Sequence, residues 1–438
     1  MKKFKRMLLL VNLLLWIKLK TFSQNSSIFK WDSFSDQPYQ IRDRKEKKKL
    51  KQKNIWNIFA TTSLSLLLFP IFLFRLLFPI RKSDIDISEF FGVGINFDKG
   101  LEQIELLKEL NLKNINIRFP LSDMDRIDEY IEFVKKFKNY NILLTVLQNR
   151  ENIENSGLFK KNIQDVFTKF SEIRILEFQI GNATNRSKWG FFSITEYLKF
   201  YKTAFDIRNR YFPKLKLVGS GVIDFEYYNT IHTLFNFQKI NYDVTSSLLY
   251  VDRRGAPENR QSIIFNLEKK IELLWGLVKI SKKTENRIYI TETNYPIRDT
   301  APYTPTSQFE TVSLDDYKKF MVRYFLISLS TQMVERVYWH QLVSAGYGLI
   351  DNREKKFKKY PAFHTFKVML NILDGRKYLS HNFSKNLHIV RFRDLEIYWT
   401  LSDEVQIQFQ ENKKVLDIDG NIENRRDVVI STSPIYIL

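Results

Sequence analysis

The sequence of 438 residues contains no cysteine and only five histidines. The lack of cysteine excludes disulfide bonds, thiolate metal sites and a cysteine nucleophile, but it does not identify the redox compartment. The histidines lack metal-ligand spacing, no Gly-x-Ser-x-Gly elbow occurs, and Gly92-Val-Gly94 lacks the third glycine of a dinucleotide-binding fingerprint. We therefore expect no metal and no other cofactor.

Acidic residues are scarce relative to basic ones. The chain has 69 Lys plus Arg against 49 Asp plus Glu, which gives a formal net charge of +20. Such an excess favours anionic surfaces, namely phosphate-rich glycans, acidic lipid or nucleic acid. The densest basic cluster, residues 42–53, precedes an apolar segment instead of lying among aromatic residues on a folded face. We therefore expect no nucleic-acid partner.

Two apolar stretches near the N-terminus indicate contact with a membrane. Residues 7–16 are flanked by lysines and are too short to cross a bilayer, so a surface-lying helix and a signal-peptide core both remain open. Residues 55–80 contain Arg75 as their only charge. Because about 20 apolar residues cross a bilayer, this segment predicts one transmembrane helix. A membrane-surface segment, or a helical hairpin broken at Pro70, is the alternative.

The charges on either side of residues 55–80 predict an orientation. The basic region 1–54 outweighs Arg81 and Lys82, so the N-terminus is expected in the cytoplasm. The protein is then a single-pass membrane protein whose main domain lies outside the cytoplasm. A peripheral position on the cytoplasmic face is the alternative.

Strand and helix patterns alternate from residue 84 to residue 375. The predicted strands are residues 90–97, 115–121, 142–147, 173–180, 215–222, 244–251, 287–291 and 334–339. Helical periodicity fills the intervals between them, for example at residues 101–110, 127–137, 194–211 and 314–330. Eight such units predict an α/β fold, a (β/α)8 TIM barrel, with an open doubly wound sheet as the rival.

The end of the chain has a different period. After a predicted helix at residues 362–373, the segments 387–392, 395–401 and 405–409 alternate with a period of two. We therefore expect a small antiparallel β domain over residues 376–438, beside a barrel that spans residues 84–375.

Polar and aromatic side chains follow the predicted strands, where barrel enzymes carry their active sites. These residues are Asn96, Arg118, Gln148, Asn149, Asn182, Asn185, Asp224, Glu226, Tyr250, Asp252, Arg253, Arg254, Glu292, Asn294, Trp339, His340 and Gln341. A rim of this kind suits a carbohydrate, because hydroxyl groups need polar partners and sugar faces need aromatic platforms. Each residue alone is weak evidence for a binding site, since arginines on strands are often ion-pair partners and tryptophans often belong to the hydrophobic core.

Two segments carry a resemblance to a known group of enzymes. Gln179-Ile-Gly-Asn-Ala-Thr-Asn185 resembles the Gly-Asn-Glu-Pro-Asn segment of the clan of retaining (β/α)8 glycoside hydrolases, clan A in type, and Tyr289-Ile-Thr-Glu-Thr-Asn-Tyr-Pro296 resembles that clan's nucleophile strand. The likeness covers residues 90–373. It implies that Glu292 is the nucleophile and that Asn182 holds the sugar 2-hydroxyl.

The resemblance also implies the remaining binding residues. Arg118 stands where the clan has an arginine on strand two, Trp339 where it has a tryptophan on strand eight, and Tyr250 where a tyrosine often follows strand six. Asn294 and Gln341, at the ends of strands seven and eight, complete the expected substrate-binding set. Leu248 occupies a position where the clan commonly has histidine.

One departure from the clan affects the chemistry. Ala183 occupies the position of the acid/base glutamate. Retaining hydrolysis uses two carboxyl groups about 5–5.5 Å apart, and the acid contributes roughly 10²- to 10⁴-fold. Asp252 and Glu258 are the candidate substitute acids, and structural pairing or solvation is the alternative for both. A donor whose leaving group is already a stable anion, bound by Arg253 and Arg254, would need no acid.

Three functions follow. The first is a membrane-anchored glycosidase or transglycosidase of retaining type that acts on a cell-envelope polysaccharide. The second is a non-catalytic glycan-binding protein, and the third is a structural partner in a polysaccharide-assembly complex. The expected partners are a carbohydrate and a membrane, and the oligomeric state is left open.

Overall fold

The computed structural model describes residues 29–77, 85–252, 255–261, 264–304, 306, 309–354, 356–384 and 386–438. Three sequence predictions lie outside these residues. They concern the apolar run at 7–16, the end of the apolar segment at 78–80, and the anion site at Arg253 and Arg254.

Eight parallel strands form a closed barrel, as predicted. The strands are β3 (Phe91–Ile95), β4 (Asn114–Pro120), β5 (Asn141–Leu147), β6 (Glu177–Ile180), β7 (Lys216–Ile223), β8 (Val244–Leu248), β9 (Ile288–Thr293) and β10 (Arg336–Trp339). β10 closes the barrel by pairing with β3, with Val337 opposite Phe91. The open doubly wound sheet is therefore wrong, because it would leave two strand edges unpaired.

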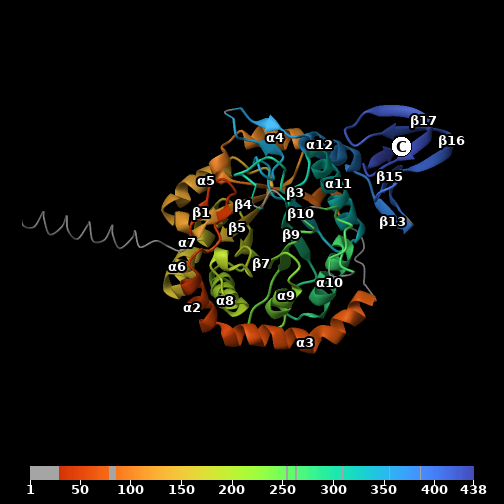
Figure 1. Cartoon of the computed structure of the whole chain (residues 1–438). Coiled ribbons are helices and arrows are strands. Elements are labelled where there is room, and N and C mark those ends of the chain that lie inside the picture. Colours follow the sequence, from red (N-terminus) through yellow and green to blue (C-terminus); the bar gives the residue numbers. More distant parts are fainter. Residues whose placement is uncertain are drawn as a thin grey trace, which may run out of the picture.

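Helices surround the strands (Figure 1). They are α4 (Gln103–Leu110), α5 (Ile127–Lys135), α6 (Arg150–Glu154), α7 (Ser156–Glu172), α8 (Ile194–Tyr211), α9 (Tyr227–Leu234), α10 (Leu267–Ile280), α11 (Leu314–Ser330) and α12 (Pro361–Leu373). Several start at a side-chain cap, since Asn155, Ser193 and Ser313 each accept a hydrogen bond from a backbone N–H of the first turn. Their apolar faces pack on the outside of the strands and form one large core.

The barrel interior is filled by side chains rather than by solvent. Leu143, Val218, Val244, Tyr289 and Tyr338, from five different strands, form a separate buried cluster. Such a layer closes the centre of the barrel, so that only the ends of the strands are open for a site.

A six-stranded antiparallel sheet follows the barrel and projects to one side of it (Figure 1). Its strands are β13 (Tyr378–Ser384), β14 (Leu387–Phe392), β15 (Leu395–Thr400), β16 (Val405–Leu416), β17 (Ile422–Ile430) and β18 (Ile435–Ile437), in the order β13-β14-β15-β18-β16-β17. This confirms the predicted C-terminal β domain. Trp399 of β15 is fully buried and belongs to the same core as the barrel helices, which joins the two units.

The N-terminal residues form structure of their own. A short hairpin, β1 (Trp31–Asp32) with β2 (Gln37–Pro38), is followed by the basic helix α2 (Arg44–Lys53) and the apolar helix α3 (Ile55–Leu77). α3 runs along the outside of the helical ring, where it packs against α8, α9 and α10 (Figure 1).

No single helix in the described part of the chain has the length and apolarity to cross a bilayer. α2 and residues 55–71 reach the required length and apolarity only when they are taken together, and the two segments are bent by 62° relative to each other. The single span at residues 55–80 therefore stays a prediction.

Candidate active site

Glu292 lies near the end of β9, on the floor of a cavity of about 140 Å³ at the C-terminal ends of the strands. Ile290 and Thr291 precede it in β9, and their β-branched side chains favour a buried strand. Pro296 follows the strand and lines the cavity wall. The strand thus delivers a carboxylate to a buried position where it is only 9% exposed.

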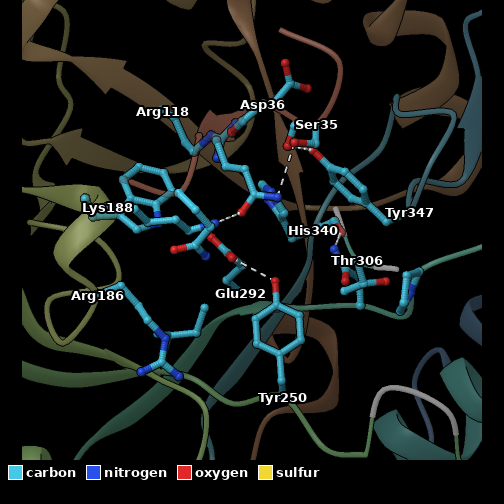
Figure 2. Close-up of a pocket in the computed structure, with 16 residues that line it drawn as sticks. Ser35, Asp36, Arg118, Arg186, Lys188, Tyr250, Glu292, Thr306, His340 and Tyr347 are labelled. Atoms are coloured by element: carbon cyan, nitrogen blue, oxygen red, sulfur yellow. Dashed lines mark hydrogen bonds between the residues drawn. The ribbon is translucent and has the colours of Figure 1, made fainter. Parts of the chain in front are cut away.

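Two neutral donors hold the Glu292 carboxylate. Tyr250 Oη donates to Oε1 at 2.7 Å (Figure 2). Asn182 Nδ2 donates to Oε2 at 3.3 Å. Asn182 is itself fixed, because its backbone N–H donates to Gln148 Oε1 at 2.9 Å and its carbonyl accepts from Gln148 Nε2 at 2.8 Å. The predicted nucleophile and the predicted orienting asparagine are therefore in contact.

The electrostatic surroundings of Glu292 favour its charged form. Burial by itself raises the pKa, but His340 in its protonated form, Arg118 and the two hydrogen bonds together outweigh burial, so the pKa of Glu292 lies below its ordinary value. Burial also lowers the pKa of His340 to about 4, so that ring is neutral near pH 7. The permanent positive charge beside Glu292 is therefore Arg118. An ionised, partly desolvated carboxylate is the form a nucleophile requires.

Ala183, which follows β6 at the position that the resemblance assigns to the acid/base residue, has apolar surroundings. Ala183 is fully buried and packs with Leu147, Trp189, Leu248 and Tyr250. Its φ of 47° places it in the left-handed region, which an alanine adopts only at a cost. The chain therefore turns sharply at this position without presenting an acid to the cavity.

The other predicted binding residues divide into two groups. Arg118, Tyr250 and Asn294 line the cavity. Gln341 is buried at its edge, where its Nε2 donates to Asp36 Oδ2 at 2.8 Å. Trp339 is not brought to the cavity, because its indole is fully buried among core aromatic rings and its Nε1 donates to a tyrosine hydroxyl. The next residue, His340, lines the cavity instead.

The two candidate substitute acids do not line the cavity. Glu258 forms a buried bidentate ion pair with Arg323, at 2.8 Å from Nε and 2.6 Å from Nη2, and also accepts a hydrogen bond from Trp399 Nε1 at 2.8 Å. Asp252 accepts a hydrogen bond from Asn259 Nδ2 at 3.4 Å. Glu258 and Arg323 both belong to the barrel, and the hydrogen bond from Trp399 joins their ion pair to the C-terminal sheet.

Sequence reasoning missed the N-terminal hairpin in the cavity wall. Ser35 and Asp36 line the cavity and lie beside Arg118 and Tyr347 (Figure 2). Arg118 Nη2 donates to the Asp36 carbonyl at 3.1 Å, and Tyr347 Oη donates to the Ser35 carbonyl at 2.7 Å. The only signal was a polar Ser/Asp turn between aromatic residues, which indicates a turn but not where it docks.

Asp36 is the second carboxylate of the site. Among the described residues, it and Glu292 are the only carboxylates that line the cavity. Burial raises the pKa of Asp36 despite the ion pair with Lys99, whose Nζ lies 3.2 Å from Oδ2. The aspartate therefore holds its proton to a higher pH than an exposed aspartate does.

The loop after β6 supplies the rest of the wall. Trp189 gives an aromatic face to the cavity, and Lys188, which donates to Gln37 of the hairpin, lies next to it. Arg186 also lines the cavity but is paired with Asp224 and Glu226. Across the described residues, no group of three or more His, Asp or Glu side chains could hold a metal ion.

Neither a protein-family profile nor a curated protein matches the sequence. Solved structures do match. A family 39 glycoside hydrolase from Bacteroides cellulosilyticus aligns with 82% of this chain and 82% of its own, at a TM-score of 0.60 and 13% identity. A family 30 endoxylanase from Clostridium papyrosolvens aligns with 82% of this chain and 97% of its own, at a TM-score of 0.56 and 10% identity.

A family 39 β-xylosidase from Caulobacter crescentus aligns with 83% of this chain and 98% of its own, at a TM-score of 0.54 and 12% identity. At these identities the likeness concerns the fold. It confirms, at that level, the resemblance to (β/α)8 glycoside hydrolases that the strand-four and strand-seven segments indicate.

Proposed function

We propose that the protein acts on a carbohydrate as a glycosidase or transglycosidase of retaining type, with Glu292 as the nucleophile. One observation carries the proposal: a buried, ionised carboxylate at the end of β9 faces a cavity while Tyr250 and Asn182 hold its two oxygens. In the reaction, a Glu292 oxygen bonds to the anomeric carbon as the bond to the leaving oxygen breaks. Water or an acceptor hydroxyl then attacks the anomeric carbon, Glu292 leaves as a carboxylate, and the proton of the attacking group passes to solvent water.

The missing acid narrows the substrate class. With Ala183 at the end of β6, the leaving oxygen receives no proton from that strand, so the first step favours a leaving group that is stable as an anion. A sugar phosphate or a lipid-linked diphosphate meets that condition. Lys188, on the loop that follows Ala183, lines the same cavity and supports an anionic leaving group there. An envelope polysaccharide built from such donors is the proposed setting.

Asp36 offers a different route to the proton. It lines the cavity with Glu292, and its raised pKa suits a general acid. The variant Asp36→Asn separates the two routes. If Asp36 is the acid, the variant loses turnover of alkyl glycosides while aryl glycosides, whose leaving groups need no proton, are spared. If the donor is pre-activated, neither class depends on Asp36.

A second candidate function is a glycan-binding protein without catalysis, and the hairpin favours it. Arg118 and Gln341, two residues expected to hold a sugar, already donate hydrogen bonds to Asp36. Arg118 donates to its carbonyl and Gln341 to its carboxylate. A sugar in that position would have to displace the hairpin or bind in front of it. Together with Ala183, this arrangement suits a protein that has kept the cleft but not the chemistry.

A mechanism-based label separates these candidates. Incubation with 2-deoxy-2-fluoroglycosyl fluorides, which carry a leaving group that needs no acid, should add one fluorosugar to Glu292, located by peptide mass mapping. Glu292→Gln is the control and should remain unlabelled. Sugar binding without an adduct would support the glycan-binding candidate. The absence of both would leave the structural partner of an assembly complex.

A further inference from the structure

The apolar helix α3 turns Thr61 and Ser65 toward the protein. Thr61 is only 5% exposed, and its Oγ1 is hydrogen-bonded with Nδ1 of His232 in α9 at 2.5 Å. Ser65 Oγ donates to the carbonyl of Tyr228, also in α9, at 3.4 Å. A helix on the surface of a soluble domain normally buries its apolar side and exposes its polar side. α3 departs from this rule, because most of its exposed side chains are large and apolar.

The outward side of α3 is made of large apolar residues. They are Ile55, Trp56, Ile58, Phe59, Leu66, Leu67, Phe69, Ile71, Leu73 and Phe74, exposed by 43–79%. Exposed aromatic side chains present about 150–250 Å² each, whereas the largest apolar patch on a soluble monomer is about 300–600 Å² in total. Residues 55–74 include no acidic or basic residue. The face is therefore more apolar than water-exposed protein surface normally is.

Basic residues lie immediately before this face. Helix α2 has the sequence Arg-Lys-Glu-Lys-Lys-Lys-Leu-Lys-Gln-Lys, and only Leu50 of it is buried. Trp56, 79% exposed, stands at the junction between the lysines and the apolar face. Lysines contact anionic headgroups, and tryptophan favours the membrane interface. An apolar helix face can enter the outer acyl region, so the three features together fit the surface of a membrane that contains anionic lipid.

We propose that α2 and α3 form a docking surface for an anionic lipid bilayer, with α3 lying in the plane of the membrane interface instead of crossing it. Crossing conflicts with the packing of α3. Its inward residues Leu64 and Leu68 pack on the barrel core, and the adjacent α8 carries the surface ion pair Lys202–Asp206. Moving α3 into the hydrocarbon would carry those charged helices with it.

A second copy of the chain fits this surface less well than lipid does. A symmetric dimer through parallel α3 helices would bring two lysine-rich α2 helices together, where like charges repel, and an antiparallel pair would leave the lysines of α2 without a counter-charge. Anionic headgroups neutralise the same lysines. The inference does not rest on the proposed function, because none of these residues touches the cavity.

Vesicle flotation tests the docking surface on the full-length chain. The protein should float with vesicles of phosphatidylcholine containing phosphatidylglycerol, and less with phosphatidylcholine alone. The double substitution Leu66→Glu and Leu67→Glu should weaken binding by roughly 100-fold, since burying each leucine contributes more than tenfold. Lys48→Gln and Lys49→Gln should each weaken binding to the anionic vesicles by roughly fivefold and leave binding to neutral vesicles unchanged.

A matched control is available in the C-terminal sheet. Leu379 and Ile422 are 59% and 55% exposed there, so Leu379→Glu with Ile422→Glu makes the same chemical change away from α3. This control should float like the unmodified chain. Equal flotation of both double variants would overturn the proposal. So would a dimer that dissociates on Leu66→Glu and Leu67→Glu while no variant binds vesicles.

The depth of α3 distinguishes lying from crossing. Because the chain has no cysteine, single cysteines at Phe59, Leu66 and Phe74 can each carry a spin label or fluorophore without background. Quenching by lipids brominated at different depths should place all three labels at the same shallow level. A deepest label at position 66, with both ends shallower on opposite leaflets, would show a crossing helix and overturn the in-plane arrangement.

Discussion

The ends of β9 and β6 touch through the hydrogen bond between Asn182 and Glu292, but they differ in what they contribute. β9 presents Glu292, buried, ionised and held by two donors. β6 leads to Asn182, which reaches Glu292, and then to Ala183, which packs against apolar neighbours. The end of β9 carries the carboxylate that is proposed to attack the anomeric carbon. The end of β6 carries no carboxyl group at position 183 that could protonate the leaving group.

This difference shows that the two halves of a two-carboxylate site are separable in structure. The contacts that hold Glu292 come from Asn182, Tyr250 and Arg118, and none of them needs a carboxylate at position 183. The barrel can therefore hold an ionised Glu292 with no carboxylate at position 183. Variants of the two strand ends test whether Glu292 reacts as the proposed nucleophile.

Loss of the nucleophile should have the largest effect. Glu292→Gln keeps the shape of the side chain and one oxygen that accepts a hydrogen bond, but it removes the attacking charge. We expect turnover of an aryl glycoside to fall by more than about 10⁴-fold, as for other enzymes that lose their nucleophile. Steady-state assays with the activated substrate measure this, and a fall below tenfold would assign the nucleophile to another group.

Adding the missing acid should have the next largest effect. Ala183→Glu should raise turnover of alkyl glycosides by about 10²- to 10⁴-fold and change aryl glycosides little. Because Ala183 is buried beside Trp189 and Tyr250, the thermal midpoint should be measured on the same sample. Ala183→Gln is the isosteric control without a proton to give. Equal gains from both variants would refute acid catalysis at this position.

Much of the fold was predictable because it depends on local periodicity. The eight strands appear as short β-branched runs, and α8 and α11 begin and end at the residues that the helical pattern predicts. The N-terminal hairpin was not predictable, because its place depends on contacts between residues more than 80 positions apart, such as Asp36 with Arg118. No local pattern encodes such a contact.

The site was predictable to the extent that its residues follow strands. Glu292, Asn182 and Tyr250 meet because parallel strands end at one face, which the sequence pattern implies. Trp339 was misplaced because a residue's direction at the end of a strand depends on register, and the β9–β10 pairing shifts register between Val337 and Trp339. The shift leaves Trp339 in the core and brings His340 to the cavity.

The candidate acid Glu258 should prove structural. Glu258→Gln leaves Arg323 buried, 2% exposed, without its counter-charge. Removing one partner of a buried ion pair typically costs about 3–5 kcal/mol, so the free energy of unfolding should fall by an amount near that range. Denaturant titration measures it. Turnover, assayed where both proteins are folded, should not change, and its loss in a fully folded variant would restore Glu258 as the acid.

Removing the hydrogen bond from Tyr250 to Glu292 should have the smallest of these effects. The change that it causes in the pH dependence of the reaction, however, is the most specific for Glu292. Hydrogen bonds to charged groups contribute about 1.5–3 kcal/mol, and this one helps to hold the pKa of Glu292 below its ordinary value. Tyr250→Phe should therefore raise the pKa of Glu292. Because the nucleophile must be ionised, the acidic limb of kcat/KM against pH should move to higher pH.

The stability of the same variant gives an independent check of the sign. A carboxyl whose pKa is lower in the folded state stabilises the fold above its unfolded pKa, and the contribution disappears as pH falls through the folded pKa. The stability difference between the unmodified chain and Tyr250→Phe should thus be largest near neutral pH and shrink in acid. Tyr295→Phe is the matched control, since within the described residues the buried Tyr295 hydroxyl has no hydrogen-bond partner. If Tyr250→Phe leaves the acidic limb in place while Tyr295→Phe behaves like the unmodified chain, Glu292 is not the group whose ionisation controls the reaction.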